Sequence, residues 1–117
     1  MKNLDLQKFR ELSIERAKNG FKTYDNVSIL FFTTALAGEL GELCNLIKKL
    51  ERAKVGGLDA GTNHKVKDIT KELLTEEIGG IFIYLDLLAS LLNVSLDEAI
   101  ITTFNQKSTQ NNLPYYY

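Results

Sequence analysis

Apolar side chains recur every three or four residues along the two longest segments of this sequence, and that spacing most constrains its fold. One apolar stripe runs through residues 28–54 and contains Phe32, Leu36, Leu43, Ile47 and Leu50. A second runs through residues 70–92 and contains Leu74, Ile78, Ile81, Leu85, Leu88 and Leu92. Such a stripe lies on one side of an α-helix and needs another surface to pack against. We therefore expect an all-α protein built as a four-helix bundle.

Residues that cap or break helices set the expected boundaries. Helices are expected over residues 5–18, 28–54, 67–92 (with residue 70 as the alternative start) and 96–107. Ser95 and Glu98 form a capping-box pattern at the start of the fourth helix, and Asn19-Gly20 should stop the first. The segment 56–65 is the only long loop, because it is rich in glycine and small polar residues. Residues 108–117, which end in three tyrosines, should be irregular.

The length and composition of the chain fit one small soluble domain. Its 117 residues are 44% hydrophobic and 25% charged, and we expect a single domain over residues 1–117 with a core at about 26–108. The net charge of −1, from 14 basic and 15 acidic residues, does not favour binding to nucleic acid. No apolar run reaches the roughly 18–20 residues of a membrane span. The single cysteine, Cys44, should be buried and reduced, so we expect a cytoplasmic protein without nucleic-acid or membrane partners.

Two carboxylates in the second expected helix border its apolar stripe instead of lying opposite it. Glu39 and Glu42 are three residues apart, so they share one side of the helix and repel each other. Partial burial makes this repulsion more costly unless a cation neutralises it, and Mg²⁺ and Mn²⁺ take oxygen ligands. Gly38 and Gly41 weaken the same helix, which the close approach of another helix or a ligand would explain. The alternative is that both glutamates flank the bundle and pair with lysines.

The third expected helix repeats this pattern. Glu77 borders its apolar stripe, and Gly79-Gly80 leaves space where side chains could have been. Glu76 lies about a quarter turn away from Glu77. Asp86 falls on nearly the opposite side of the helix, so it cannot join a metal site centred on Glu77 and is expected at solvent or at an interface.

The order and spacing of several motifs resemble a known family. Ala37-Gly-Glu-Leu-Gly-Glu is followed by Glu76-Glu-Ile, by Asn93-Val-Ser-Leu-Asp-Glu-Ala and by Phe104-Asn-Gln-Lys-Ser. This series, within residues 26–108, resembles the MazG-like, all-α nucleoside triphosphate pyrophosphohydrolases. The resemblance implies a subunit that assembles as a homodimer or a homotetramer. It also implies cleavage of a nucleoside or deoxynucleoside triphosphate into the monophosphate and pyrophosphate, with Mg²⁺ as the cofactor and Mn²⁺ as the alternative ion.

The resemblance also assigns the metal ligands. The family holds its ion with an ExxE motif on one helix and an ExxD motif on the next. Glu39 and Glu42 match the first motif and Glu77 matches the first acid of the second, so these three are the expected metal-binding and catalytic residues. The final aspartate of ExxD should stand at position 80, which is Gly80 here. The alternative to an active hydrolase is therefore a degenerate nucleotide-binding or structural helical module that lost turnover through Gly80.

Three further residues are candidate substrate contacts. The resemblance implies that Asn105 and Lys107 contact the nucleotide. Lys49, on the edge of the second helix that carries the glutamates, is a candidate phosphate ligand. The alternative for each lysine is an ordinary solvated side chain, and for Asn105 a polar residue near a helix end. His64, the only histidine, and the glycine-rich loop around it are expected to form a connector without a phosphate-binding motif.

Overall fold

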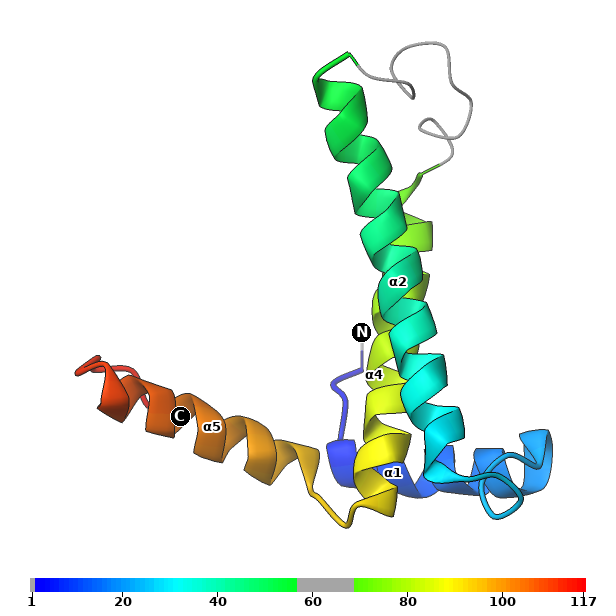
Figure 1. Ribbon diagram of the computed structural model, residues 1–117. Helices are drawn as coiled ribbons and strands as arrows, with labels where there is room; N and C mark the ends of the chain where they lie inside the picture. Colours follow the sequence, from blue (N-terminus) through cyan, green and yellow to red (C-terminus); the bar gives the residue numbers. More distant parts are fainter. Residues whose placement is uncertain (1, 57–68) are drawn as a thin grey trace. The chain divides into compact units, whose positions relative to one another are not determined.

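Helices, short connections and two irregular end segments make up the residues that the computed structural model describes, 2–56 and 69–117. Four α-helices, labelled α1, α2, α4 and α5, and one π-helical segment, η1, follow one another along this part of the chain (Figure 1). These residues contain no strand, so the all-α prediction is confirmed. The predicted loop 56–65, apart from its first residue, lies outside the described residues, as do His64 and the helix start at Lys67.

The chain divides into two compact units. The first consists of Met1–Ile29 and Asp86–Tyr117, and the second consists of Leu30–Leu85. The second unit contains all three predicted metal ligands, whereas Asn105 and Lys107 belong to the first. The predicted site residues are therefore shared between two separately packed parts of the chain.

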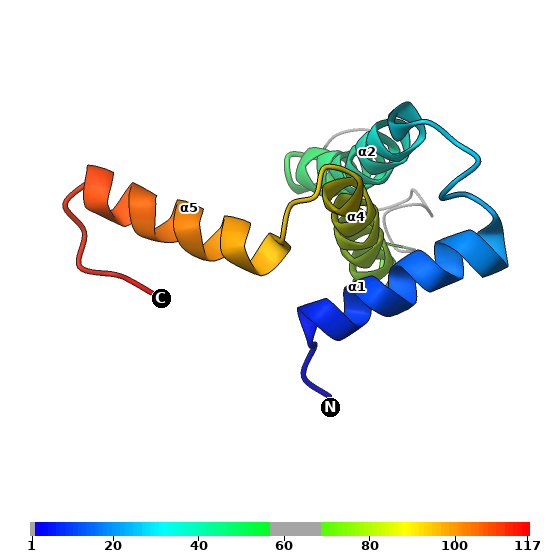
Figure 2. The ribbon, with the colours of Figure 1, turned by 90° about the horizontal axis from the view of Figure 1, so that it is seen from below.

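The described residues of the second unit form two antiparallel helices. α2 spans Ile29–Lys54 and α4 spans Lys71–Leu91, and they lie side by side in both ribbon views (Figure 1, Figure 2). The hydroxyl of Thr70 accepts a hydrogen bond from the backbone N–H of Leu73 at 3.2 Å, which caps the first turn of α4. After α2, Gly56 adopts a φ of 75°, a left-handed conformation that glycine takes without strain. Both helices thus begin and end close to their predicted boundaries.

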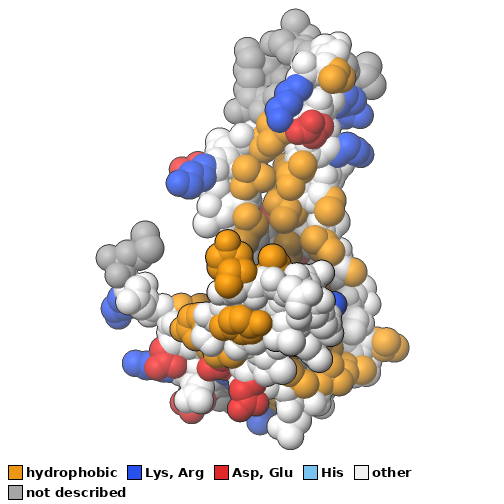
Figure 3. Space-filling view, turned by 90° about the vertical axis from the view of Figure 1, so that its left-hand side faces the viewer, with side chains coloured by type: hydrophobic (Ala, Val, Ile, Leu, Met, Phe, Trp, Pro, Cys, Tyr) orange, Lys and Arg blue, Asp and Glu red, His pale blue; other side chains and the backbone are white. Residues whose placement is uncertain are grey.

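Only part of the two predicted apolar stripes is buried within this chain. Phe32 in α2 is fully enclosed, whereas Ile78, Leu85 and Leu92 are exposed by 57%, 38% and 57%. Because these three residues are seven positions apart, they form one outward-facing row along α4 and just beyond its end. In the space-filling view, hydrophobic side chains form a band on the surface over the helical pair (Figure 3). Cys44 is exposed as well, so the prediction that it is buried was wrong.

α2 is long and apolar enough to cross a membrane by length and composition, and no other described helix meets that criterion by itself. Only 6% of its apolar window is buried. The core helices of soluble proteins and signal sequences meet the same criterion, so this is a weak indication of a membrane. The absence of a membrane partner therefore stays a prediction.

The first helical stretch extends further than predicted, because a π-helical segment follows α1. α1 spans Leu6–Glu15, and the carboxylate of its N-cap, Asp5, accepts hydrogen bonds from two backbone N–H groups. The chain continues as η1, Arg16–Phe21, so the helical path passes through Asn19-Gly20 instead of stopping there. Residues five apart become neighbours in a π-helix. Accordingly, the guanidinium carbon of the first residue of η1 lies 5.6 Å from the ring centroid of its last, a cation–π contact that fits the wider turn.

The last helix is longer than predicted. α5 spans Leu96–Gln110, and the hydroxyl of Ser95 accepts a hydrogen bond from the backbone N–H of Glu98, as the capping pattern predicts. The irregular tail begins only after this helix. Its last residue, Tyr117, folds back on α5, where its backbone N–H donates to the side-chain oxygen of Asn105 at 2.9 Å.

Asp86 is buried within the chain, so its predicted place at solvent or at an interface was wrong. Its side chain is 2% exposed, and one of its oxygens accepts hydrogen bonds from the guanidinium of Arg10 at 2.8 and 3.1 Å. Arg10 also donates to the backbone carbonyl of Val94 at 2.7 Å. A carboxylate between two leucines in an apolar stretch was the available sequence signal. Its partner lies 76 residues away in the chain, and only the tertiary structure brings the two together.

Candidate metal centre

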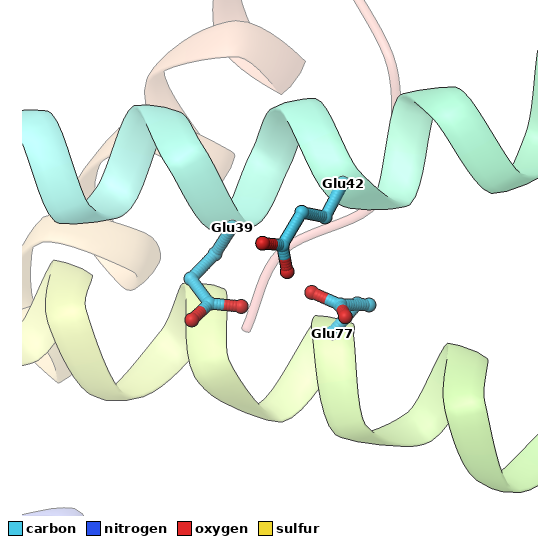
Figure 4. A group of neighbouring side chains, drawn as sticks. All are labelled: Glu39, Glu42 and Glu77. Carbon is cyan, nitrogen blue, oxygen red and sulfur yellow. The ribbon is translucent and has the colours of Figure 1, made fainter.

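Three carboxylates from two helices converge in the second unit. Glu39 and Glu42 project from α2 and Glu77 projects from α4, and their side chains point toward one another between the helices (Figure 4). One carboxylate oxygen from each residue lies within 4.8 Å of the other two. Glu39 and Glu77 are half-buried, whereas Glu42 is exposed. The structure thus brings together the three residues that the sequence singled out; we call them the glutamate cluster.

No lysine or arginine neutralises the glutamate cluster within residues 2–56 and 69–117. The ion pairs Arg10–Asp86 and Lys54–Glu51 do not include its members. One oxygen of Glu77, Oε2, is buried and accepts no hydrogen bond from any described group. The alternative in which these glutamates pair with lysines therefore finds no support in the described part of the chain.

Crowding of the carboxylates changes the acidity of the cluster. The pKa of Glu77 rises from its ordinary value of 4.5 to about 7. The largest cause is side-chain hydrogen bonding with Glu39, which needs a proton on one of the two groups, and partial burial is the second. Glu42 adds a similar contact and the repulsion of its charge. At neutral pH the cluster therefore resists full ionisation unless a cation replaces the proton.

The donor set fits a hard divalent cation. Carboxylate oxygens are the ligands that Mg²⁺ and Mn²⁺ prefer. With metal–oxygen bonds of about 2.1 Å, octahedral ligands lie about 3.0 Å apart when adjacent and about 4.2 Å apart when opposite. The observed limit of 4.8 Å thus leaves only a small side-chain adjustment. A cation would also give the buried Oε2 of Glu77 a partner and would remove the repulsion between the three groups.

The helix glycines differ sharply in their surroundings. A Cβ added at Gly38, Gly41 or Gly79 would meet no atom within 4 Å in the described part of the chain. No described helix therefore approaches Gly38 or Gly41 closely, and the alternative, the approach of a ligand, stays a prediction. At Gly80, in contrast, an added Cβ would lie 2.8 Å from a carboxylate oxygen of Glu39. The residue at the expected position of the fourth ligand is thus the one in contact with the cluster.

The three predicted substrate contacts lie outside the cluster, and so does Glu76. Glu76 is exposed and is not among the converging carboxylates. Lys49 is half-buried on α2, two turns or about 10 Å along the helix axis from Glu42. On α5, Lys107 is exposed, and the side-chain amide of Asn105 is engaged through both its oxygen and its nitrogen with the backbone of the last residue. Of the predicted substrate contacts, only Lys49 shares a helix with part of the cluster.

Comparison of this chain with protein-family models, with curated proteins and with solved structures found no match in any of the three. The resemblance to the MazG-like hydrolases therefore depends on the sequence motifs alone. What that resemblance implies for activity, cofactor and assembly is a proposal for this chain.

Proposed function

We propose that this protein is a metal-dependent nucleotide pyrophosphohydrolase, which converts nucleoside or deoxynucleoside triphosphates into monophosphates and pyrophosphate. The observation that carries the proposal is the convergence of Glu39, Glu42 and Glu77 without a cation from residues 2–56 or 69–117. These residues would hold Mg²⁺, with Mn²⁺ as a substitute. Mg²⁺ usually keeps several waters and takes further ligands from substrate phosphates, so three carboxylates suffice to anchor it.

The burial of the three carboxylates suggests how they divide the chemistry. A bound ion would neutralise charge on the triphosphate and make a water molecule more acidic. Glu39 and Glu77, which are half-buried, are suited to orient the ion, and Glu42, which is exposed, is suited to accept a proton from the attacking water. The water oxygen then bonds to the α-phosphorus while the bond from that phosphorus to the bridging oxygen breaks. Pyrophosphate leaves with the electron pair, and we propose that Lys49 contacts its charge.

A panel of triphosphates tests the proposal directly. Each nucleotide is incubated with the protein and Mg²⁺ or Mn²⁺, and monophosphate and pyrophosphate are both quantified. We expect equal amounts of the two products, and no product from Glu39→Gln because that variant removes an anionic ligand. Glu76→Gln is the matched control, since it neutralises an exposed glutamate outside the cluster. Equal activity in the two variants would rule the cluster out as the active site.

One observation favours a second function, a nucleotide-binding module without turnover. Gly80 stands where the resemblance implies a fourth carboxylate, so the site has one ligand fewer than its family pattern. A binding module would be stabilised against heat by a triphosphate with Mg²⁺ and would release no pyrophosphate. A purely structural helical module would show no stabilisation by either metal or nucleotide. Thermal denaturation with and without these ligands, run beside the product assay, separates the three functions.

We further propose that the chain assembles as a homodimer or a dimer of dimers. The exposed row of Ile78, Leu85 and Leu92 supports this, and so do Leu40 and Ile47 on α2, which are also seven residues apart and exposed by 49% and 46%. Rows at this spacing are typical of helices that pack against other helices. Light scattering should give two or four times the chain mass of 13.2 kDa, and Leu85→Asp should lower that mass. A monomer at micromolar concentration would contradict this proposal.

A further inference from the structure

Gly80 and Glu39 compete for one small volume. A Cβ built on Gly80 would lie 2.8 Å from Oε2, 2.9 Å from Cδ and 3.4 Å from Cγ of Glu39. Real Cβ atoms essentially never come closer than 3.0 Å to such neighbours. The carboxylate of Glu39 therefore occupies the space that any side chain at position 80 would need.

The two partners differ in how easily they can move. Gly80 lies inside α4 with an ordinary helical conformation, so alanine can replace it without backbone strain. The contacting atoms of Glu39, in contrast, are the far end of a flexible side chain. A side chain at position 80 should therefore push the carboxylate away and leave the helix in place. Ordinary contact begins at 3.4 Å, so the oxygen would have to move by at least about half an ångström.

A displacement of this size matters more for some ions than for others. Mg²⁺ demands a nearly ideal octahedron with bonds of about 2.0–2.1 Å. Mn²⁺, the alternative ion for this site, takes similar oxygen ligands and serves as its substitute in the test below. Ca²⁺ accepts six to eight oxygens at about 2.3–2.6 Å in flexible arrangements. Moving one ligand of the glutamate cluster should weaken the binding of Mg²⁺ and Mn²⁺ more than that of Ca²⁺.

We propose that Gly80 is a positioning residue, whose missing side chain seats the carboxylate of Glu39 in a three-glutamate metal site. This inference rests on the proposed function, because it needs the glutamate cluster to bind an ion. It also changes what Gly80 means for this chain. The missing side chain leaves room for the carboxylate of Glu39 among the three ligands. Gly80→Asp can therefore add a carboxylate only if the carboxylate of Glu39 moves away.

The test compares two neighbouring glycines of the same helix by titration calorimetry. Gly80→Ala and Gly79→Ala both remove a helix-interior glycine, but only the first introduces a Cβ against Glu39. We expect Mn²⁺ to bind Gly80→Ala at least about tenfold more weakly than the unmodified protein, with a smaller change for Ca²⁺. Gly79→Ala should bind both ions like the unmodified protein. Introducing Gly80→Ala into Glu39→Gln should have little further effect, because the ligand that it displaces is already gone.

The outcomes separate this inference from the proposed function. If the unmodified protein binds no Mn²⁺, the proposed function fails and the role of Gly80 falls with it. If it binds Mn²⁺ and Gly80→Ala binds equally well, only the role of Gly80 is overturned. Thermal denaturation without metal is the second measurement. Gly80→Ala should unfold near the temperature of Gly79→Ala, and a variant that fails to fold would also overturn the inference, because the helix and not the carboxylate would have given way.

Discussion

Each of the two units of this protein holds a carboxylate in a protected position, but only the carboxylate of the first unit meets a described cation. In the first unit, Asp86 receives the guanidinium of Arg10 at 2.8 Å. In the second unit, Glu77 has two carboxylates for neighbours and no described cation. Asp86 and Glu77 each keep one buried oxygen without a hydrogen-bond partner in the described residues, so the difference lies in the supply of positive charge. The described residues thus supply a cation to Asp86 and none to the glutamate cluster, where we propose that a metal ion binds.

The largest effect should come from removing the cation of the first unit. Arg10→Met leaves Asp86 buried without its charge partner and also removes the hydrogen bond to Val94. Loss of one member of a buried ion pair costs about 3–5 kcal/mol, and the partial exposure of Arg10 places our expectation at about 3 kcal/mol. The free energy of unfolding, measured by urea denaturation, checks this. In the double variant Arg10→Met with Asp86→Leu most of the loss should be recovered, and a single-variant loss below about 1 kcal/mol would break the comparison.

Neutralising the protected carboxylate of each unit should change the free energy of unfolding in opposite directions. Asp86→Asn should lower the free energy of unfolding because it weakens a buried ion pair, whereas Glu77→Gln should raise it in metal-free protein because it relieves repulsion. With Mn²⁺, Glu77→Gln should instead be less stable than the unmodified protein. The variant has lost a metal ligand and should bind the ion at least about tenfold more weakly. Thermal melts with EDTA and with Mn²⁺ measure both changes. If Glu77→Gln destabilises the metal-free protein, the carboxylate of Glu77 has a stabilising partner, which would contradict the comparison with Asp86.

A smaller effect should appear in the dependence of stability on pH. The folded protein holds a proton on Glu77 up to about pH 7, while the unfolded chain releases it near 4.5. The stabilisation from this proton is therefore fully present below about pH 4.5 and is lost as the pH rises through about 7. Urea midpoints between pH 4 and 8 in EDTA should fall over this range by more for the unmodified protein than for Glu77→Gln. Parallel curves for the two proteins would show that Glu77 titrates normally.

The smallest effect should come from the exposed ion pair at the end of α2. The Nζ atom of Lys54 lies 2.9 Å from Oε1 of Glu51, but the two side chains are 70% and 66% exposed. Water and salt screen such a pair, so Lys54→Met should change the free energy of unfolding by no more than about 0.5 kcal/mol. The same urea assay checks this. If Lys54→Met lowered the free energy of unfolding as much as Arg10→Met does, burial would not determine how strongly an ion pair stabilises this protein.

Local interactions made much of the fold predictable. α2 and α4 were found from apolar spacing, and Ser95 marked the start of α5 because capping depends on residues three positions apart. The end of the first helix was missed at Asn19-Gly20. Such a pair disfavours a helix by only about 1 kcal/mol, and the chain continued through it as the π-helical η1.

For the candidate site, the sequence by itself determined which side of each helix Glu39, Glu42 and Glu77 occupy, because helical periodicity fixes directions within one helix. It did not determine that the two sides face each other within 4.8 Å, that Asp86 meets Arg10, or that Gly80 borders Glu39. Those relations join residues far apart in the chain. They depend on how α2 packs against α4 and on how the parts of the first unit meet, which the packing of many side chains decides together.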